Sequence, residues 1–461
     1  MSADPKDRSH DVSRRSFLAA GSLSAAATLL AACSGSGGSS ANSNTAPKSV
    51  PSASMKKALS KPATITFWTW VPDIAQEVAM FEKAYPNIKV KLVNAGQGLA
   101  EYTKLRTALK AGTGAPDVVQ IEYSYLPTFT VTHDLIDLAP YGANDIKDDY
   151  VEWTWKQVSV GDTVYAIPQD TGPMGMVYRK DIFDKYNLTI PKTWAQFAEQ
   201  GKKLHAANPH ISMLNLANND AGQMFGYAWQ AGARPFEVNG STIKISVNSP
   251  EMKKMADYYT PLVQSGVVSG DADFNNDWYA GLTNGSYATW VTAAWAPVFM
   301  ESAAAKSSGK WRVVKMPQWS AGQDVSGNWG GSTSAVTKQS ANPEVAAAFA
   351  MYLNHNLQSS MRLATKQSLF PPLKATLHSS KFTNQASAFF GGQKVNELYA
   401  KISDTVSTDF QWSPFNDYVT STYNQIFGGA LTKKSSLSAA LDSWQSQLVT
   451  YAKQQGFTVT S

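Results

Sequence analysis

The sequence predicts an α/β protein made of two α/β units, and three observations lead to that prediction. Strand-like apolar segments alternate with segments of helical periodicity from residue 65 onward, an order typical of parallel sheets covered by helices. The same alternation starts again near residue 173. The chain has 461 residues, of which 43% are hydrophobic and 16% charged, so it can bury large cores. A length of this kind favours two domains over one.

The first unit is expected to run strand, helix, strand, helix, strand. Apolar β-type strands are expected at 65–71, 88–95 and 116–122. The helix between the first two strands is predicted by the helical spacing of Ile74, Val78, Phe81 and Tyr85. The next helix covers 99–111 and stops at Gly112. The last strand is continuously apolar, as in parallel strands that are buried on both faces.

The second unit repeats these signals over a longer stretch. Helices are expected at 191–208, 249–266 and 342–354, and strands at 211–217, 286–292, 311–317 and 331–337. No internal repeat is visible, and the last third of the chain is rich in helical patterns.

The N-terminus has the layout of an export signal. Arg14 and Arg15 precede an uncharged apolar run, and the order of charged head, apolar core and small-residue zone is that of a secretory signal over residues 1–32. The paired arginines resemble a twin-arginine signal, although general secretion stays open. Leu30-Ala31-Ala32-Cys33 resembles the lipobox of bacterial lipoproteins, which implies lipidation of the one cysteine, Cys33. An ordinary signal peptide with a chance cysteine is the alternative.

Residues 33–61 are expected to form a flexible tether after the lipidated cysteine. The segment is made mostly of Ser, Gly, Ala, Asn, Pro and Lys, with almost no large apolar side chains. Two acyl chains give stable membrane anchoring. We therefore expect a body held at the extracytoplasmic face of the cell membrane.

Composition and motifs exclude several function classes. The formal net charge is only +5 and no basic run with interleaved aromatics occurs, so nucleic acid is not expected as a partner. One cysteine cannot form an internal disulfide, a Cys-rich metal site or, in this position, a protease nucleophile. Metalloprotease, nucleophile-elbow, phosphate-loop and dinucleotide motifs do not occur, so no cofactor, metal or catalytic residue is expected. A glycosidase with paired carboxylates stays open.

Five motifs occur in an order that resembles a known family. They are "ITFWTW", "GTGAPDVVQIE", "GDTVYAIPQDTGPMGMVYRKDIF", "LTNGSYATWVTAAW" and "NWGGSTSAV", and they follow the lipobox and tether. Together they resemble the extracellular solute-binding proteins of ATP-driven sugar importers, in the maltose-binding-like class. The resemblance covers roughly residues 62 to 450.

This resemblance implies a two-lobed α/β fold with a hinge that the chain crosses more than once. The implied lobes are 62–172 with 290–340, and 173–289 with 341–461. A sugar would bind in the interlobe cleft, stabilise a closed form and be delivered unchanged to the permease subunits of the transporter. We expect the protein to be a monomer and not an enzyme.

Candidate ligand-binding residues come from two arguments. Ligands of open α/β sheets sit beyond the carboxyl ends of strands, which selects Trp70, Glu122, Tyr123, Gln169 and Asp170. The family pattern adds Trp295, Trp329, Gly330 and Gly331. Sugars need aromatic platforms beside fixed polar groups, and the chain has 14 tryptophans. Further candidates on this ground are Trp229, Trp278 and Trp412, with Asp277 either binding hydroxyls or capping a helix.

Two other readings of the chain remain. One is a secreted lipoprotein enzyme that acts on glycans. The other keeps the binding-protein architecture and replaces the sugar by a peptide, a polyamine or an anion.

Overall fold

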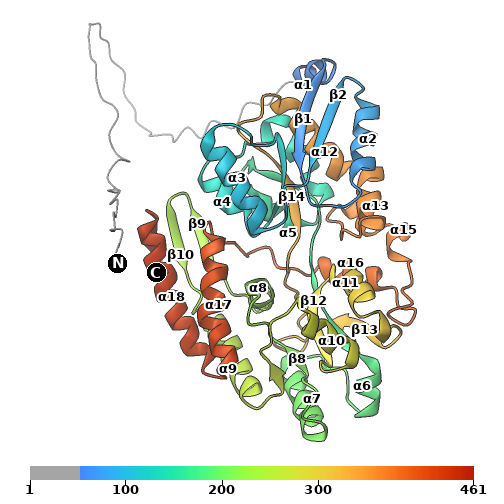
Figure 1. Cartoon of the computed structure of the whole chain (residues 1–461), viewed down its shortest axis with the longest axis vertical. Coiled ribbons are helices and arrows are strands. Elements are labelled where there is room, and N and C mark those ends of the chain that lie inside the picture. The colour runs from blue at the N-terminus through green and yellow to red at the C-terminus, as the bar shows by residue number, and fades with distance from the viewer. Residues whose placement is uncertain (1–51, 461) are drawn as a thin grey trace, which may run out of the picture. The chain divides into compact units, whose positions relative to one another are not determined.

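The computed structural model describes residues 52–460 and shows two lobes, the first built around one large sheet and the second around three small ones (Figure 1). The sheet of the first lobe has the strand order β2-β1-β3-β14-β6. Its strands are β1 (Ala63–Trp68), β2 (Ile88–Val93), β3 (Val118–Glu122), β6 (Ala166–Pro168) and β14 (Ser332–Val336). β1 is parallel to β2 and β3, which confirms the predicted parallel arrangement. β14 inserts antiparallel between β3 and β6, so the complete sheet is mixed.

Helices cover this first sheet, and one of them comes from late in the chain. Phe349 of α12 packs edge-on against Phe67 of β1 and Phe81 of α2, with ring centroids 5.3 Å and 5.1 Å apart. The first lobe contains the helices α2 (Ala75–Ala84), α3 (Leu99–Ala111), α4 (Leu126–Val131), α5 (Glu152–Val158), α12 (Pro343–His355), α13 (Leu357–Thr365), α14 (Lys374–Leu377) and α15 (Ser380–Thr383), the 3-10 helices η1 (Ala139–Tyr141) and η2 (Ala143–Asp149), and the hairpin β4 (Ser159–Val160) and β5 (Thr163–Val164).

Three small sheets lie in the second lobe. The central one has the order β12-β7-β13 and is antiparallel, with every residue of β7 buried. Strands β9 and β10 form a hairpin to which β15 adds in parallel, and β8 pairs with β11. The strands are β7 (Met174–Arg179), β8 (Leu214–Asn215), β9 (Phe236–Asn239), β10 (Thr242–Ile245), β11 (Val268–Ser269), β12 (Thr289–Ala293), β13 (Trp311–Lys315) and β15 (Thr458–Thr460).

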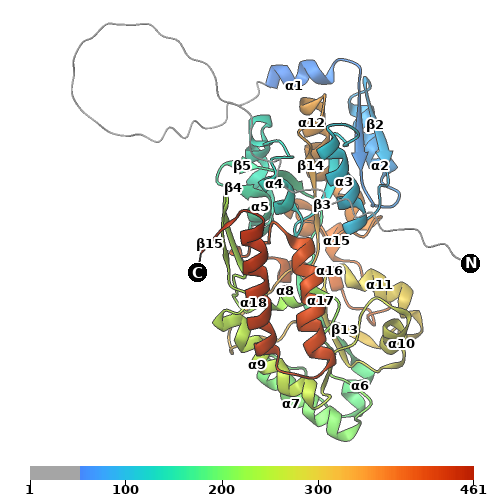
Figure 2. The ribbon, with the colours of Figure 1, turned by 60° about the vertical axis from the view of Figure 1, so that its left-hand side comes forward.

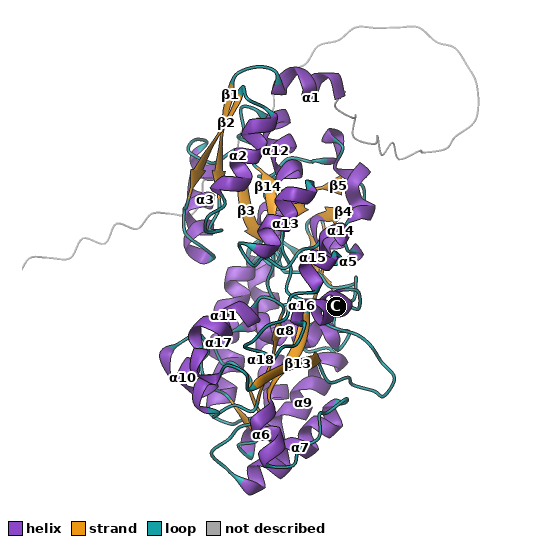
Figure 3. Cartoon of the chain, turned by 90° about the vertical axis from the view of Figure 1, so that its right-hand side faces the viewer, coloured by secondary structure: helices purple, strands orange, loops and turns teal. Residues whose placement is uncertain are grey.

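The helices of the second lobe surround these sheets (Figure 3). The long helices α17 and α18 lie side by side (Figure 2), and α18 also contacts α9. The helices are α6 (Lys180–Lys185), α7 (Trp194–Ala207), α8 (Ala221–Gln230), α9 (Pro250–Gln264), α10 (Asn276–Asn284), α11 (Ala296–Ala303), η3 (Ala305–Ser307), α16 (Val395–Ser403), α17 (Asn416–Thr432) and α18 (Leu437–Gln454). A capping box of Thr193 and Gln196 starts α7, and Ser249 caps α9.

The strand pairing corrects the predicted lobe boundaries in two places. Residues 290–315 were assigned to the first lobe, but β12 and β13 hydrogen-bond to β7 of the second lobe. Residues 341–383 were assigned to the second lobe, but α12 and α13 pack against α2 of the first lobe. Sequence periodicity shows that a strand exists and not which sheet it joins, so these boundaries were wrong. The chain therefore passes between the lobes after β6, after β13 and after α15.

The end of the predicted tether is helical. Residues Ser52–Leu59 form helix α1, which contacts α12 of the first lobe. The predicted export signal over residues 1–32, and Cys33 itself, lie outside the described residues. Among residues 52–460, no helix has the length and apolar character needed to cross a membrane.

Candidate functional site

Polar side chains connect the ends of four strands in the first sheet. Gln120 accepts a hydrogen bond from the Thr69 hydroxyl at 2.7 Å and from the Trp70 amide at 3.3 Å. Its own amide donates to the Ser332 hydroxyl at 2.8 Å. The Ser332 amide and hydroxyl both donate to the carboxylate of Asp170. The carboxyl ends of β1, β3 and β6 thus meet at one edge, where the topology of α/β sheets places ligands.

Two carboxylates of the first lobe lie at this edge without a cationic hydrogen-bond partner. Tyr102 donates its hydroxyl to Glu122 at 3.0 Å, but burial and the nearby Asp170 and Asp220 raise the pKa of Glu122 to about 7. Glu101 in the first turn of α3 is 0% exposed, and neither of its carboxyl oxygens has a hydrogen-bond partner. Burial, with the charge of Glu122, raises the pKa of Glu101 to about 8.

The second lobe contributes two more carboxylates. Asp220 caps α8 by accepting the Gln223 amide at 3.1 Å, yet burial still raises the pKa of Asp220 to about 6. Asp273 follows β11, is 4% exposed and has no partner for either carboxyl oxygen. Burial, with the charge of Asp220, raises the pKa of Asp273 to about 8.

These acids form one group, the carboxylate cluster: Glu101, Glu122, Asp170, Asp220 and Asp273. They are close enough to raise one another's pKa across the two lobes, since Asp220 of the second lobe acts on Glu122 of the first. With pKa values of about 8, Glu101 and Asp273 are mostly protonated at pH 7, so each carboxyl group can donate one hydrogen bond as well as accept others. The cluster therefore suits a ligand whose groups both donate and accept hydrogen bonds, as hydroxyl groups do.

An aromatic wall, the tryptophan cluster, adjoins the carboxylates. Trp295 and Trp329 meet at 76° with centroids 4.9 Å apart, and the Trp295 indole donates to the Trp329 carbonyl at 2.7 Å. Phe274 lies 6.1 Å and 6.2 Å from these two rings, is 39% exposed and has a φ of 54°. Trp278 and Trp290 pack behind it. A large exposed aromatic residue on a left-handed backbone is strained, and such strain concentrates at ligand-contacting positions.

Close backbone approaches hold the two clusters together. Gly222 lies beside Asp220, and a Cβ there would be 2.7 Å from the Trp329 indole nitrogen. Gly331 has a φ of 91°, and a Cβ would meet the Asp170 carbonyl at 2.7 Å. Only glycine fits these positions without displacing a neighbour. The carboxylate cluster and the tryptophan cluster are therefore parts of one site.

The structure brings most of the sequence-predicted residues to this site. Those at or next to the two clusters are Trp70, Glu122, Tyr123, Asp170, Trp278, Trp295, Trp329, Gly330 and Gly331. Gln169 lies inside the first sheet, where it accepts the Ser334 hydroxyl at 2.9 Å. Asp277 is exposed, and Asn275 caps its helix instead. The ligand-binding role of each residue stays a prediction.

Trp229 and Trp412 belong to a different aromatic group. Trp229 stacks on Phe410 at 4.4 Å, meets Trp153 of the first lobe at 5.6 Å and donates to the Ser407 carbonyl. Trp412 contacts Trp229 and Phe410. This group lies at the junction between the lobes and reaches Tyr123 through Trp153, whose ring centroid is 6.0 Å from that of Tyr123.

Sequence reasoning missed Glu101, Asp220, Asp273, Phe274 and Trp290. Asp220 and Asp273 follow β8 and β11, so the strand-end rule could have selected them. The two-residue length of both strands hid that signal. Glu101 is on a helix and reaches the site only through the tertiary fold.

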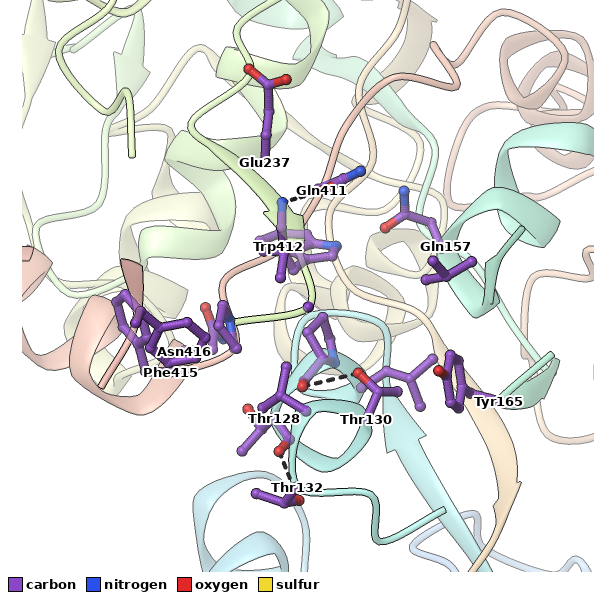
Figure 4. A pocket seen from close by; sticks show the side chains of 18 of the residues that line it. Thr128, Thr130, Thr132, Gln157, Tyr165, Glu237, Gln411, Trp412, Phe415 and Asn416 are labelled. Carbon is purple, nitrogen blue, oxygen red and sulfur yellow. Dashed lines mark hydrogen bonds between the residues drawn. The ribbon is translucent and has the colours of Figure 1, made fainter. Parts of the chain in front are cut away.

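A pocket of about 1090 Å³ is lined by residues of both lobes (Figure 4). The threonines of α4 form one side of it, and Trp412, Phe415 and Asn416 lie opposite. No member of the carboxylate cluster lines it, and neither do Trp295 and Trp329. Over residues 52–460, no three or more His, Cys, Asp or Glu side chains are arranged to hold a metal ion.

Comparison with known proteins identifies the family. The model for bacterial extracellular solute-binding proteins matches residues 66–355. The chain belongs to this family. It is 24% identical to the arabinooligosaccharide-binding protein of Halalkalibacterium halodurans over 78% of this chain and 84% of the relative. It is 25% identical to the lactose-binding protein of Rhizobium radiobacter over 73% of this chain and 81% of the relative.

Solved structures of this class resemble the chain over both lobes. One is the transporter-associated binding protein of B. animalis subsp. lactis Bl-04 with β-1,6-galactobiose, at a TM-score of 0.73, 32% identity and coverage of 87% of this chain and 100% of that one. Another is the galacto-N-biose-/lacto-N-biose I-binding protein of Bifidobacterium longum, at a TM-score of 0.75, 27% identity and coverage of 87% and 99%. The two-lobed α/β fold predicted from the sequence is confirmed.

Proposed function

We propose that this solute-binding protein captures a neutral sugar between its lobes and delivers it, chemically unchanged, to the permease of an ABC importer. The relatives support the ligand class, since their names refer to arabinooligosaccharides, lactose and galactobiose. The observation that carries the proposal is the meeting of the carboxylate cluster with the Trp295–Trp329 corner. Hydroxyl groups of a sugar supply donors to the carboxylates, and its C–H faces suit the indole rings.

This arrangement also explains why a ligand would drive closure. Within the protein, Glu101 and Asp273 have no hydrogen-bond partner for their carboxyl oxygens, and Glu122 of the first lobe lies near Asp220 of the second. Separating the lobes returns these groups to water. A sugar that contacts both lobes lowers the free energy of the closed form relative to the open form. The open–closed equilibrium then shifts by the difference between the sugar's affinities for the two forms.

Anchoring and delivery are the finer part of the proposal. The lipobox-like sequence before Cys33 supports a lipid anchor on the extracytoplasmic face of the membrane, with either the twin-arginine or the general route of export. The permease would recognise the surface that the two lobes present together in the closed form.

A thermal-shift screen of the purified full chain against mono-, di- and oligosaccharides tests the proposal. A sugar at about 100 times its dissociation constant adds about 2.7 kcal/mol to stability, which moves the melting midpoint by a few degrees. We expect a selective shift with one sugar class and recovery of that sugar intact. A sugar recovered cleaved would favour a glycan-active enzyme, and no shift with any sugar would favour a peptide, polyamine or anion.

A further inference from the structure

Helix α1 carries exposed lysines and lies beside further exposed lysines of the first lobe. Lys56 and Lys57 are exposed on α1, and Lys61 is exposed just before β1. Lys83 is exposed in the last turn of α2, and Lys89 is exposed near the start of β2. Together these five lysines form the basic surface.

Specific contacts hold the elements of the basic surface next to one another. The Asn87 side chain donates to the Ser60 carbonyl at 2.8 Å, which joins the end of α1 to the turn before β2. β1 and β2 start side by side, with Ala63 opposite Ile88. Leu59 of α1 packs on the hydrophobic core of the lobe. Helix α1 therefore has one side on the protein, while its two lysines are in contact with solvent.

Acidic side chains are scarce around the basic surface. Between residues 52 and 91 the acids are Asp73, Glu77 and Glu82. Asp73 precedes α2 and Glu77 is buried in its first turn, whereas the basic surface includes the last turn of that helix. Glu82 pairs with Lys89 at 3.6 Å, and the other four lysines have no ion-pair partner among the described residues. Helix α12, which packs on α1, contributes one acid, Glu344 in its first turn. The surface therefore keeps a net positive charge.

The basic surface and the candidate ligand site lie at opposite ends of the first sheet. Strand β1 starts beside α1, and its carboxyl end leads to Thr69 and Trp70 at the candidate site. Figure 2 shows α1 at the tip of the first lobe, with the second lobe and its helix α7 at the opposite end of the molecule. A large partner could therefore contact the basic surface without covering the ligand edge.

The position of α1 in the chain indicates which partner this is. Helix α1 begins at Ser52 and is the first described element after Cys33, the expected site of lipidation. The chain between these two residues can extend over at most about 70 Å, so an anchored protein keeps α1 within reach of the bilayer. Anionic headgroups attract basic segments close to a membrane, and the attraction is about fivefold in binding for each lysine.

We propose that the basic surface of the first lobe binds the phosphate headgroups of an anionic lipid bilayer. Because the surface lies at the amino ends of β1 and β2, this contact directs the ligand edge at their carboxyl ends away from the membrane and toward the solution. The inference goes beyond sugar capture and does not depend on it. A lipid on Cys33 would raise the local concentration of the surface at the bilayer, but the contact does not require that lipid.

Acetylation of lysines, measured by mass spectrometry on the full chain mixed with an excess of vesicles, tests the contact. One set of vesicles contains equal parts of phosphatidylglycerol and phosphatidylcholine, and the reference set is pure phosphatidylcholine. We expect acetylation of Lys56 and Lys57 to slow about fivefold on the anionic vesicles, which corresponds to about 1 kcal/mol for one lysine at an anionic bilayer. This protection should disappear at about 1 M salt, where the Debye length is only about 3 Å. Lys202 and Lys203, an exposed pair on α7, should react equally with both sets of vesicles.

Two double variants with the same change of charge separate the basic surface from the total charge of the protein. Lys56→Gln with Lys57→Gln should remove the protection of Lys61, whereas Lys202→Gln with Lys203→Gln should leave it unchanged. All four substituted side chains are exposed, so both variants should fold. Equal acetylation of Lys56 and Lys57 on the two sets of vesicles, or equal protection of Lys202 and Lys203 on the anionic set, would overturn the proposal. Both variants should bind sugar like the unmodified protein, so a failure of sugar binding would count against the function proposed above and not against this contact.

Discussion

Trp295 and Trp329 form an edge-to-face corner, in which the Trp295 indole donates to the Trp329 carbonyl at 2.7 Å and the rings meet at 76°. This hydrogen bond holds the Trp295 ring against the backbone of Trp329. Gly222 and Gly330 allow the backbone to lie against these rings. A preorganised aromatic corner beside acceptor groups lowers the ordering cost of binding.

Trp295→Ala should weaken sugar affinity by more than tenfold, a loss of about 1.4 kcal/mol or more, because the stacking surface is removed. Calorimetric titration measures it. Trp319→Ala is the control, since Trp319 is a half-buried tryptophan that packs on Trp194 and Tyr258 away from the site. Equal affinities in the two variants would remove Trp295 from the site.

Asp273→Asn should stabilise the unliganded protein and weaken sugar binding at the same time. The buried charge is lost, which at pH 8 adds on the order of 1 kcal/mol to the free energy of unfolding, and an acceptor for hydroxyl groups is lost with it. Urea unfolding and titration of each variant measure the two effects. Asp277→Asn, four residues later and exposed, should change neither. A destabilised Asp273→Asn would contradict the account of the cluster.

The stability of the unliganded protein should fall as pH rises from about 4.5 to 8. Burial raises the pKa of Glu101 from 4.5 to about 8 and that of Asp273 from 3.8 to about 8, while Lys104 acts in the opposite direction on Glu101. The folded protein thus binds more protons than the unfolded chain in this range, and the linkage relation makes the slope negative. We expect a loss of at least about 1.4 kcal/mol, the equivalent of one pKa unit. Urea unfolding at several pH values measures it.

A saturating sugar should flatten this pH dependence, because hydroxyl donors favour the ionised carboxylates. Stability that rises with pH in the absence of sugar would show that the carboxylates are not buried as described.

Arg106→Ala should weaken sugar binding by about two- to fivefold, because Arg106 and Asp417 join α3 of the first lobe to α17 of the second at 2.6 Å. Both side chains are about one-third exposed, and such pairs contribute roughly 0.2–1 kcal/mol. Lys89→Ala breaks a pair with Glu82 inside the first lobe and should leave affinity unchanged. Titration of both variants with sugar separates the effect of losing an ion pair between the lobes from the effect of changing the surface charge.

Cys33→Ala should move the protein from the membrane fraction to the soluble extracytoplasmic fraction. The thiol is the expected site of lipidation, and the chain offers no other cysteine. Immunoblots of both fractions measure this, with Ser34→Ala as the control. Membrane retention of Cys33→Ala would contradict the lipid anchor.

Local signals in the sequence were sufficient to predict most helices and strands, and the residues at the strand ends of the first lobe. The apolar run at β3 and the residues after it correctly located Glu122 and Tyr123, because strand ends are a local property. The partner of β12 is not local: its pairing with β7 depends on residues more than 100 positions earlier. Asp220 and Asp273 were missed for a different reason, since β8 and β11, the strands before them, are only two residues long and leave a weak strand signal.

A crystal structure of the protein with the sugar selected by the thermal-shift screen tests the central claim most directly. The account predicts a sugar ring against Trp295 and Trp329, with hydroxyl groups donating to Asp220 and Asp273 and to at least one carboxylate of the first lobe. A sugar bound only away from these residues would contradict it.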